Sequence, residues 1–371
     1  MAAEPHTIPV APPAAAAAPT AGSALLALDH EELVIRRGTR SGLYTVVAVH
    51  STVLGPSLGG CRMWHYTSGA EAARDALRLS RAMTLKAAAA GLVLGGGKGV
   101  ICLPPGTHAP DGDDRRAALL DFADTVDALE GSYITAEDVG TSARDMVTIA
   151  ERTAHVVGLP TVHGGGGDPS PYTAQGVEAA MRACCAAAFG SRELGDRTVA
   201  VVGCGHVGER LARRLAAAGA RVVLADVDGA KRELVAELPC AEWAEPSSAV
   251  LANVDVLAPC ALGAVLDEQT VARVRARVIC GAANNQLAHD GLAAALAERG
   301  VLYAPDFVVN AGGLINVAAE LEPGGYDAER TRERVGEIED VMADILTEAA
   351  SAGTTPLAAA VGRARRRLES V

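Results

Sequence analysis

The sequence of 371 residues lacks the features that would direct it to a membrane, a metal ion or a nucleic acid. No apolar stretch is both long enough and free enough of glycine, proline and charge to span a bilayer. A formal net charge of −12 disfavours nucleic acids and anionic membranes, because their phosphate groups would repel the protein. The eight cysteines form no C-x-x-C pair, and none lies at metal-ligand spacing from a histidine. We therefore expect free thiols and no bound metal.

The N-terminal segment also lacks the two parts of a secretory signal, a basic start and an unbroken apolar core. Residues 1–24 contain no lysine or arginine, several prolines and a run of alanines. We expect this segment to be a disordered tail outside the folded protein. Free cysteines and the missing export signal together indicate a cytoplasmic location.

Lysine is scarce, because only Lys86, Lys98 and Lys231 are lysines among 33 basic residues. Arginine keeps its proton at every accessible pH, whereas a desolvated lysine can lose it. A lysine retained in such an arginine-rich chain is therefore a candidate for proton transfer. Lys98 follows three glycines, which let the backbone approach a ligand or a strand closely. The alternatives are that Lys86 is a surface lysine and that Lys98 lies on an ordinary glycine turn. Lys231 serves as a control, because it lies in a polar helix, 229–238, and is expected to be solvated.

The first half of the chain reads as a mixture of strands and helices. Residues 33–53 alternate in polarity around a glycine-containing turn and predict a hairpin. Residues 71–90 and 115–129 have apolar side chains at helical spacing, and 133–136 reads as a short strand. This order predicts an α/β domain.

The second half alternates strictly between strands and helices, which is typical of a doubly wound parallel sheet. Residues 198–202 form a continuous apolar run, as expected for a strand buried on both faces. Expected helices flank this strand at 173–189 and 207–218, and the next strand is 221–226. Further strands are expected at 254–257, 278–280 and 301–303.

We therefore expect an α/β fold of two domains, joined at the Gly/Pro-rich stretch 164–171. The first domain, 25–163, would be the substrate and catalytic domain. The C-terminal helices, from about residue 345 to 371, would rejoin it. The second domain, 164–344, would be a Rossmann-type domain.

A dinucleotide-binding turn lies between the strand 198–202 and the helix after it. Its sequence is Gly203-Cys204-Gly205-His206-Val207-Gly208. Glycines at these positions allow a tight turn, close approach to a pyrophosphate and helix–strand packing. Asp226 ends the next expected strand, where a carboxylate would bind the adenosine ribose and repel a 2′-phosphate. NAD is therefore favoured, with NADP left open because Arg221 and Lys231 are near in sequence.

Two carboxylates, Glu137 and Asp138, follow the short strand 133–136. One of them could cap the next helix, which is the structural interpretation. The functional interpretation is a proton shuttle beside the catalytic lysine.

Several motifs together resemble the Glu/Leu/Phe/Val dehydrogenase superfamily, in order and in spacing, from about residue 25 to the end. The leucine/valine dehydrogenase branch is the most similar, with the valine enzymes nearest. The matching segments are Leu58-Gly59-Gly60-Cys61-Arg62-Met63, Lys86, Gly95-Gly96-Gly97-Lys98, Thr135-Ala136-Glu137-Asp138-Val139-Gly140-Thr141, Gly281-Ala282-Ala283-Asn284-Asn285-Gln286 and Asn310-Ala311-Gly312-Gly313.

The resemblance implies roles for the polar residues of the first half. Lys86 would bind the substrate α-carboxylate, helped by the backbone of Gly59 and Gly60. Lys98 would be the lysine of low pKa that activates water, and Asp138 would exchange protons with the amine.

The resemblance also implies roles for residues in the second half of the chain, and it implies which partners the protein has. Thr173 and Asn284 would hold the nicotinamide carboxamide of NAD, and Asn310 would position the substrate. The partners would be an L-amino acid, its 2-oxo acid and ammonia, and the protein would be a homo-oligomer.

The resemblance also implies a substrate pocket lined by Leu58, Ala136, Leu314 and Val317. A glutamate-specific relative has lysine before the Gly-Gly pair, where Leu58 stands here. Because a desolvated carboxylate facing leucine would be costly, we expect a branched-chain substrate such as valine, leucine or isoleucine. One methylene is worth only about 1–3 kcal/mol, so a mixed preference is expected. The alternatives are phenylalanine or another L-amino acid, or a catalytically silent NAD-binding regulator.

Overall fold

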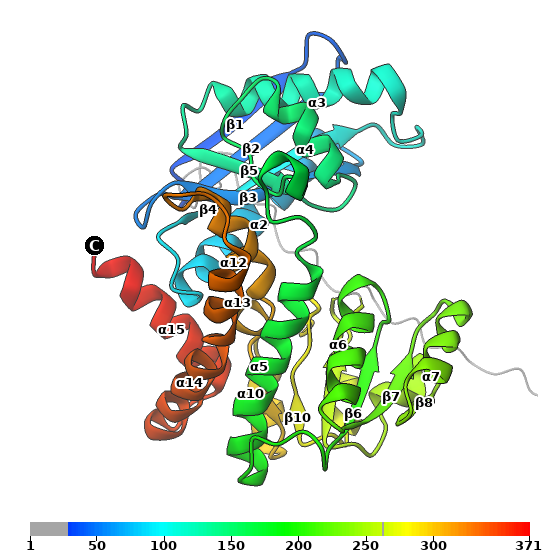
Figure 1. Cartoon of the computed structure of the whole chain (residues 1–371). Helices are drawn as coiled ribbons and strands as arrows, with labels where there is room; N and C mark the ends of the chain where they lie inside the picture. Colours follow the sequence, from blue (N-terminus) through cyan, green and yellow to red (C-terminus); the bar gives the residue numbers. More distant parts are fainter. Residues whose placement is uncertain (1–28, 262) are drawn as a thin grey trace, which may run out of the picture.

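The computed structural model describes residues 29–261 and 263–371, which form two α/β lobes (Figure 1). The expected disordered tail, residues 1–24, lies outside the described residues. Within those residues, no helix is long and apolar enough to cross a membrane. The described part likewise contains no group of three or more His, Cys, Asp or Glu side chains that could hold a metal ion.

The first lobe is built on a mixed sheet of five strands in the order β1-β2-β4-β3-β5. Antiparallel pairing joins β1 to β2 and β2 to β4, whereas β3 runs parallel to both β4 and β5. The strands are β1 (Glu32–Arg37), β2 (Tyr44–Ser51), β3 (Ser57–His65), β4 (Gly95–Leu103) and β5 (Tyr133–Glu137).

Helices cover both faces of this sheet because successive residues of a strand point to opposite sides. On β2, Val46 and Ala48 are buried together with Ala72 and Ala76 of α2 (Gly69–Ala89). Val47 and Val49 are instead buried in a separate cluster on the opposite face. That cluster includes side chains of α3 (Gly112–Asp127) and α4 (Ala143–Ala150).

Strands β3 and β4 were not among the strands predicted from the sequence, because both are rich in glycine, which has a low strand propensity. The glycines before Lys98 do not form a turn but begin β4. A Cβ on Gly97 would lie 2.5 Å from the ring of Tyr133, and one on Gly96 would lie 2.1 Å from the backbone nitrogen of Thr84. These glycines therefore allow β4 to pack closely against its neighbours.

The second lobe is built on six parallel strands in the order β11-β10-β9-β6-β7-β8. This is the order of a Rossmann-type sheet, with β6 first in sequence and at the crossover point. The expected α/β fold with a doubly wound second domain is confirmed. The strands are β6 (Thr198–Val202), β7 (Arg221–Ala225), β8 (Ala241–Trp243), β9 (Val256–Pro259), β10 (Val278–Ile279) and β11 (Leu302–Tyr303).

Helices accompany this sheet and continue beyond it to the C-terminus (Figure 1). Those associated with the sheet are α5 (Ser170–Phe189), α6 (His206–Ala217), α7 (Leu234–Glu237), α8 (Pro246–Val250), α9 (Glu268–Arg273) and α10 (Leu292–Glu298). The helices after the last strand are α11 (Asp306–Val309), α12 (Gly312–Ala318), α13 (Ala328–Gly336), α14 (Ile338–Ala352) and α15 (Pro356–Glu369). Short 3-10 turns lie at η1 (Thr161–His163), η2 (Gly229–Glu233) and η3 (Ala319–Leu321).

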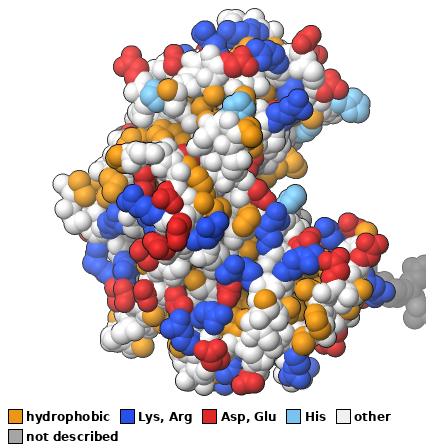
Figure 2. All heavy atoms as spheres, viewed as in Figure 1, with side chains coloured by type: hydrophobic (Ala, Val, Ile, Leu, Met, Phe, Trp, Pro, Cys, Tyr) orange, Lys and Arg blue, Asp and Glu red, His pale blue; other side chains and the backbone are white. Residues whose placement is uncertain are grey.

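Two connections hold the lobes together. The glycine-rich stretch leads directly into α5, which begins at Ser170 rather than at Thr173 because Pro171 occupies its first turn. At the C-terminus, α15 returns to the first lobe, where Arg367 Nη2 donates to Gly91 O at 2.9 Å and Leu92 O at 3.0 Å. On the right side of the view, the surface of the molecule is hollowed between the two lobes (Figure 2).

Candidate active site

Lys98 and Asp138 form a close ion pair in the first lobe. The Nζ of Lys98, on β4, lies 2.7 Å from Oδ2 of Asp138, which follows β5. The Lys98 side chain is only 6% exposed, so its ammonium is largely removed from water. The two residues predicted to be catalytic are thus brought together.

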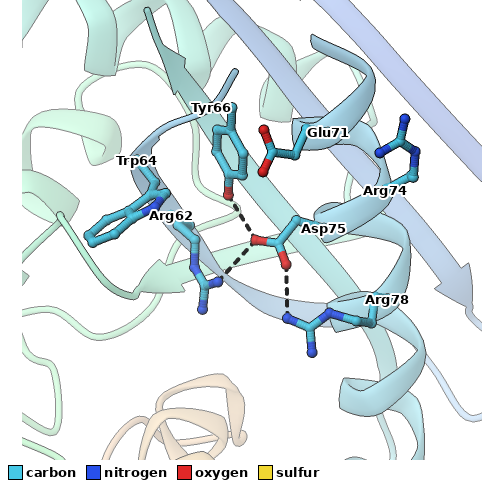
Figure 3. A pocket seen from close by; sticks show the side chains of 7 residues that line it. All are labelled: Arg62, Trp64, Tyr66, Glu71, Arg74, Asp75 and Arg78. Carbon is cyan, nitrogen blue, oxygen red and sulfur yellow. Dashed lines mark hydrogen bonds and ion pairs between the residues drawn. The ribbon is translucent and has the colours of Figure 1, made fainter. Parts of the chain in front are cut away.

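Arg62 contacts the same carboxylate. Its Nε lies 2.8 Å from Asp138 Oδ2, and its Nη1 lies 3.0 Å from Asp75 Oδ2 on α2. The hydroxyl of Tyr66 also donates to Asp75, at 2.8 Å (Figure 3). Arg62 belongs to the Gly59-Gly60 motif, but the sequence analysis gave it no role. Parallel pairing of β3 with β5 was the missing information, because it sets Cys61 opposite Glu137 and so brings Arg62 beside Asp138.

Burial and neighbouring charges change the pKa values of this pair. Burial lowers the pKa of Lys98 below its usual value, and the Arg62 cation lowers it further, whereas Asp138 acts in the opposite direction. Burial alone would raise the pKa of Asp138. The Lys98 and Arg62 cations outweigh burial and hold the pKa of Asp138 below its usual value. The pair thus combines a lysine that is easier to deprotonate with a carboxylate that stays ionised.

Lys86 reaches the same region from the C-terminal end of α2. Burial lowers the pKa of Lys86 to about 8, and repulsion by Lys98 acts in the same direction. Attraction to Asp306, which begins α11 in the second lobe, opposes this shift. Burial in turn raises the pKa of Asp306, whose Oδ2 accepts a hydrogen bond from Gln286 N at 3.1 Å. Asp306 was not predicted from the sequence, since no local pattern places it opposite Lys86.

Gly59 and Gly60 lie on β3 beside this group, where no side chain would fit. A Cβ on Gly59 would lie 1.7 Å from Gly97 O. One on Gly60 would lie 2.5 Å from Glu137 O and 2.8 Å from Asp138 Cβ. Close packing of the strands therefore requires glycine at both positions.

The four residues expected to line the substrate pocket belong to one buried apolar cluster: Leu58, Ala136, Leu314 and Val317. Leu58 and Ala136 come from the first lobe, and Leu314 and Val317 from α12 in the second. Gly158 lies between two of them, because a Cβ on it would be 3.9 Å from both Ala136 Cβ and Val317 Cγ1. The two lobes thus share one buried apolar cluster.

The predicted amide residues meet at the loop after β10. The Nδ2 of Asn310 donates to Asn284 Oδ1 at 2.8 Å and to Ala282 O at 3.0 Å. The Oδ1 of Asn310 is buried and has no hydrogen-bond partner in the described part of the chain. Thr173, on α5, lies close to the segment that begins with Asn310, since a Cβ on Gly313 would lie 2.6 Å from Thr173 Oγ1. An unpaired buried acceptor is consistent with a ligand that donates a hydrogen bond there.

The turn between β6 and α6 has the geometry of a pyrophosphate site. Gly203 adopts a φ of +103°, which disfavours other residues, and a Cβ on Gly208 would lie 1.8 Å from Gly203 O. Space is open around Gly205, the N-cap of α6, whose first turn receives no side-chain cap. The backbone N–H groups of His206 and Val207, at the start of α6, are therefore in position for an anion.

The carboxylate expected to bind the ribose lies next to this turn. Asp226 directly follows β7, and its Oδ2 accepts a hydrogen bond from Cys204 N at 2.6 Å. The two cations that left NADP open have other partners. Arg221 Nε donates to Thr198 Oγ1 at 3.1 Å, and Lys231 Nζ lies 3.7 Å from Glu209 Oε2.

Comparison with known proteins identifies the family. Residues 30–155 match "Glu/Leu/Phe/Val dehydrogenase, dimerisation domain", and residues 224–368 match "Glutamate/Leucine/Phenylalanine/Valine dehydrogenase". The chain belongs to this family. A leucine dehydrogenase of Thermoactinomyces intermedius is 42% identical over 341 residues, which are 92% of this chain and 91% of that protein. A valine dehydrogenase of Streptomyces albus is 43% identical over 342 residues, 91% of this chain and 92% of that protein.

A solved structure of an amino-acid dehydrogenase shows the same fold. L-tryptophan dehydrogenase from Nostoc punctiforme has a TM-score of 0.80 at 35% identity, and the match covers 94% of this chain and 98% of that one. The expected enzyme class, an amino-acid dehydrogenase, is therefore confirmed, and enzymes of this family use a nicotinamide cofactor. Leucine and valine dehydrogenases match at nearly the same identity, so neither kind is set apart as the nearer.

Proposed function

We propose that this chain catalyses the reversible NAD-dependent oxidative deamination of valine, leucine or isoleucine to the 2-oxo acid, ammonia and NADH. The observation that carries the proposal is the buried Lys98–Asp138 ion pair, with Nζ and Oδ2 2.7 Å apart. A lysine whose pKa is lowered, beside an ionised carboxylate, can take up and release a proton, which hydrolysis of an imine requires.

The residues around the pair provide a place for the substrate. The ammonium of Lys86, from the end of α2, would bind the α-carboxylate, and the backbone of Gly59 and Gly60 would help to hold it. Asn310, whose Oδ1 is buried and unpaired, would accept a hydrogen bond from the substrate amine. Asp138 would take a proton from this amine, so that the nitrogen lone pair is free when hydride leaves Cα.

The bound cofactor would supply the hydride acceptor. Lys98, as a neutral amine, would then take a proton from water as its oxygen adds to the imine carbon. Asp138 would return a proton to the nitrogen and, once ionised again, would take the hydroxyl proton as ammonia leaves and the carbonyl forms. Lys98 and Asp138 thus share the proton transfers, which explains why both lie in one buried ion pair.

NAD is the proposed cofactor rather than NADP. His206, Val207 and the turn glycines would hold the pyrophosphate, and Asp226 would accept hydrogen bonds from the ribose. A 2′-phosphate would be repelled by Asp226, and Arg221 and Lys231, which already have partners, would not compensate for it. Thr173 and Asn284 would hold the nicotinamide carboxamide.

The buried apolar cluster shared by the lobes supports a branched-chain substrate. Leu58, Ala136, Leu314 and Val317 offer no charge to a distal carboxylate. A catalytically silent regulator would not need a buried lysine–carboxylate pair, which costs desolvation energy. The phenylalanine alternative, or another L-amino acid, differs from the proposal in the size of this pocket and is an outcome of the assay below.

We also propose that the protein is a homo-oligomer in which the first lobe provides a contact between copies. The family description of residues 30–155 as a dimerisation domain supports this proposal. A related glutamate dehydrogenase from Thermus thermophilus is described as hetero-hexameric. Light scattering of the purified protein tests the proposal, and a monomeric mass would contradict it.

The central experiment measures NADH formation from a panel of L-amino acids, with NAD and NADP compared for each. We expect the highest kcat/KM for leucine, valine or isoleucine with NAD, and reductive amination of the matching 2-oxo acids with ammonia. Faster turnover of phenylalanine or glutamate would contradict the proposed pocket. Absence of turnover with every amino acid, despite measurable NAD binding, would contradict the proposed activity.

A further inference from the structure

Two cations bind one oxygen of Asp138. Lys98 Nζ lies 2.7 Å and Arg62 Nε 2.8 Å from Oδ2. The other carboxylate oxygen, Oδ1, receives no hydrogen bond within the described residues. Lys98 and Arg62 therefore share one side of the carboxylate, and its second oxygen stays available.

Arg62 is fixed in this position by contacts on its far side. Its Nη1 lies 3.0 Å from Asp75 Oδ2, and Asp75 is itself held by Tyr66 and by Arg78, the latter at 2.9 Å. These residues line a cavity of about 340 Å³ (Figure 3). Two carboxylates therefore hold the Arg62 guanidinium, Asp138 at Nε and Asp75 at Nη1.

Resting on the proposed function, we propose that Arg62 is a positioning residue that occupies one oxygen of Asp138, so that this carboxylate does not hold Lys98 permanently as an ammonium. A carboxylate paired with lysine alone favours the protonated lysine. A second, permanent cation weakens that preference, because it repels the ammonium and competes for the same lone pairs. Arginine suits this task because it keeps its proton at every accessible pH.

Among the described residues, the other groups around Lys98 do not supply a permanent positive charge. Asp138 approaches from the loop after β5, Cys61 from β3 and Lys86 from α2, while the neutral Ala48 pairs with Lys98 on β2. Lys86 is the second cation, but it can lose its proton and would be neutralised by a substrate carboxylate. Arg62 is therefore the cation near Lys98 whose charge does not change during turnover.

The test compares Arg62→Met, which removes the charge, with Arg62→Lys, which keeps it. The chain has three lysines, so protein grown with lysine labelled with ¹³C at Cε gives few NMR signals, and Lys98 can be titrated directly without turnover. Lys98→Arg identifies its signal. In Arg62→Met we expect the pKa of Lys98 to rise by about one unit, as loss of a unit charge a few ångströms away implies. In Arg62→Lys it should stay close to the parent value.

The pH profile of leucine oxidation is the second readout. In Arg62→Met, the rise of kcat/KM with pH should move to higher pH by as much as the pKa of Lys98 rises. In Arg62→Lys, this rise should occur at the same pH as in the parent protein. An unchanged pKa of Lys98 in Arg62→Met would overturn the proposal for Arg62 alone. A parent protein that fails to oxidise any amino acid would instead overturn the proposed function, and the NMR titration would still decide on Arg62. If Arg62→Met does not fold, Arg62→Gln removes the charge while keeping a hydrogen-bonding side chain.

Discussion

Lys98 and Asp138 meet across a strand that belongs to neither of them. Lys98 is on β4 and Asp138 follows β5, and β3 lies between these strands in the sheet. The pairing register brings Gly60 of β3 next to both Lys98 and the end of β5. Because Gly60 has no side chain, the ion pair can close over it at 2.7 Å.

Replacing Lys98 with arginine should keep the charge and remove the ability to lose a proton. We expect kcat to fall by about 10²- to 10⁴-fold, the usual contribution of a general base. The affinity for NAD, measured by calorimetry, should not change. Lys231→Arg is the matched control, because Lys231 is outside the site and faces Glu209 at 3.7 Å. Activity of Lys98→Arg near that of the control would refute the assigned role.

Carboxylate binding should depend on the protonation of Lys86. The pKa of Lys86 is lowered to about 8, so the ammonium is present below this pH and is lost above it. The inhibition constant of 4-methylpentanoate, a leucine analogue without an amine, should be constant at lower pH. Above the pKa it should rise by about tenfold per pH unit. In Lys86→Met we expect weak inhibition that is independent of pH across this range. A variant whose inhibition constant depends on pH as in the parent protein would contradict the proposed role of Lys86.

Leu58 should determine the rejection of acidic substrates. Leu58 is 1% exposed and joins the apolar cluster with Ala136 and Val317. We expect Leu58→Lys to lower kcat/KM for leucine by at least about tenfold and to raise the value for glutamate, because the ammonium gains a partner only with an acidic side chain. Leu58→Met, which roughly conserves volume, should change little the ratio of kcat/KM for leucine to kcat/KM for glutamate. A ratio that is equal in both variants would show that selection occurs elsewhere.

Glu320 should hold the connection between the lobes. Its Oε1 accepts a hydrogen bond from Gly166 N at 2.8 Å, and its Oε2 accepts one from Gly158 N at 3.0 Å. Glutamine has one acceptor oxygen, so Glu320→Gln should leave one of these amides without its bond and lower the free energy of unfolding by about 1–3 kcal/mol. Chemical denaturation measures this loss, with the exposed Glu329→Gln as control.

The same substitution should affect catalysis through Gly158, which lies against Ala136 and Val317 of the proposed pocket. We expect KM for leucine to rise more than kcat falls in Glu320→Gln. Stability and KM that both match the Glu329→Gln control would rule out this function for Glu320.

Much of the architecture could be predicted because it depends on local patterns. The apolar run of β6, the glycines of its turn and the helical spacing of α6 all lie within one short segment, and the structure has them in that order. The strands β3 and β4 could not be predicted from propensity. Their glycines disfavour strands in isolation, and they are tolerated here because the neighbouring backbone and side chains occupy the space of a Cβ.

The sequence by itself determined which residues are able to do the chemistry. The scarcity of lysine in an arginine-rich chain and the two carboxylates after a short strand supplied the candidates, and the resemblance to a known family narrowed them to Lys86, Lys98 and Asp138. Only the tertiary structure decided their state, because charge and burial depend on residues distant in the chain. Arg62 reaches Asp138 through the pairing of β3 with β5, and Asp306 faces Lys86 from the other lobe. The fold therefore sets the pKa values that the sequence leaves undetermined.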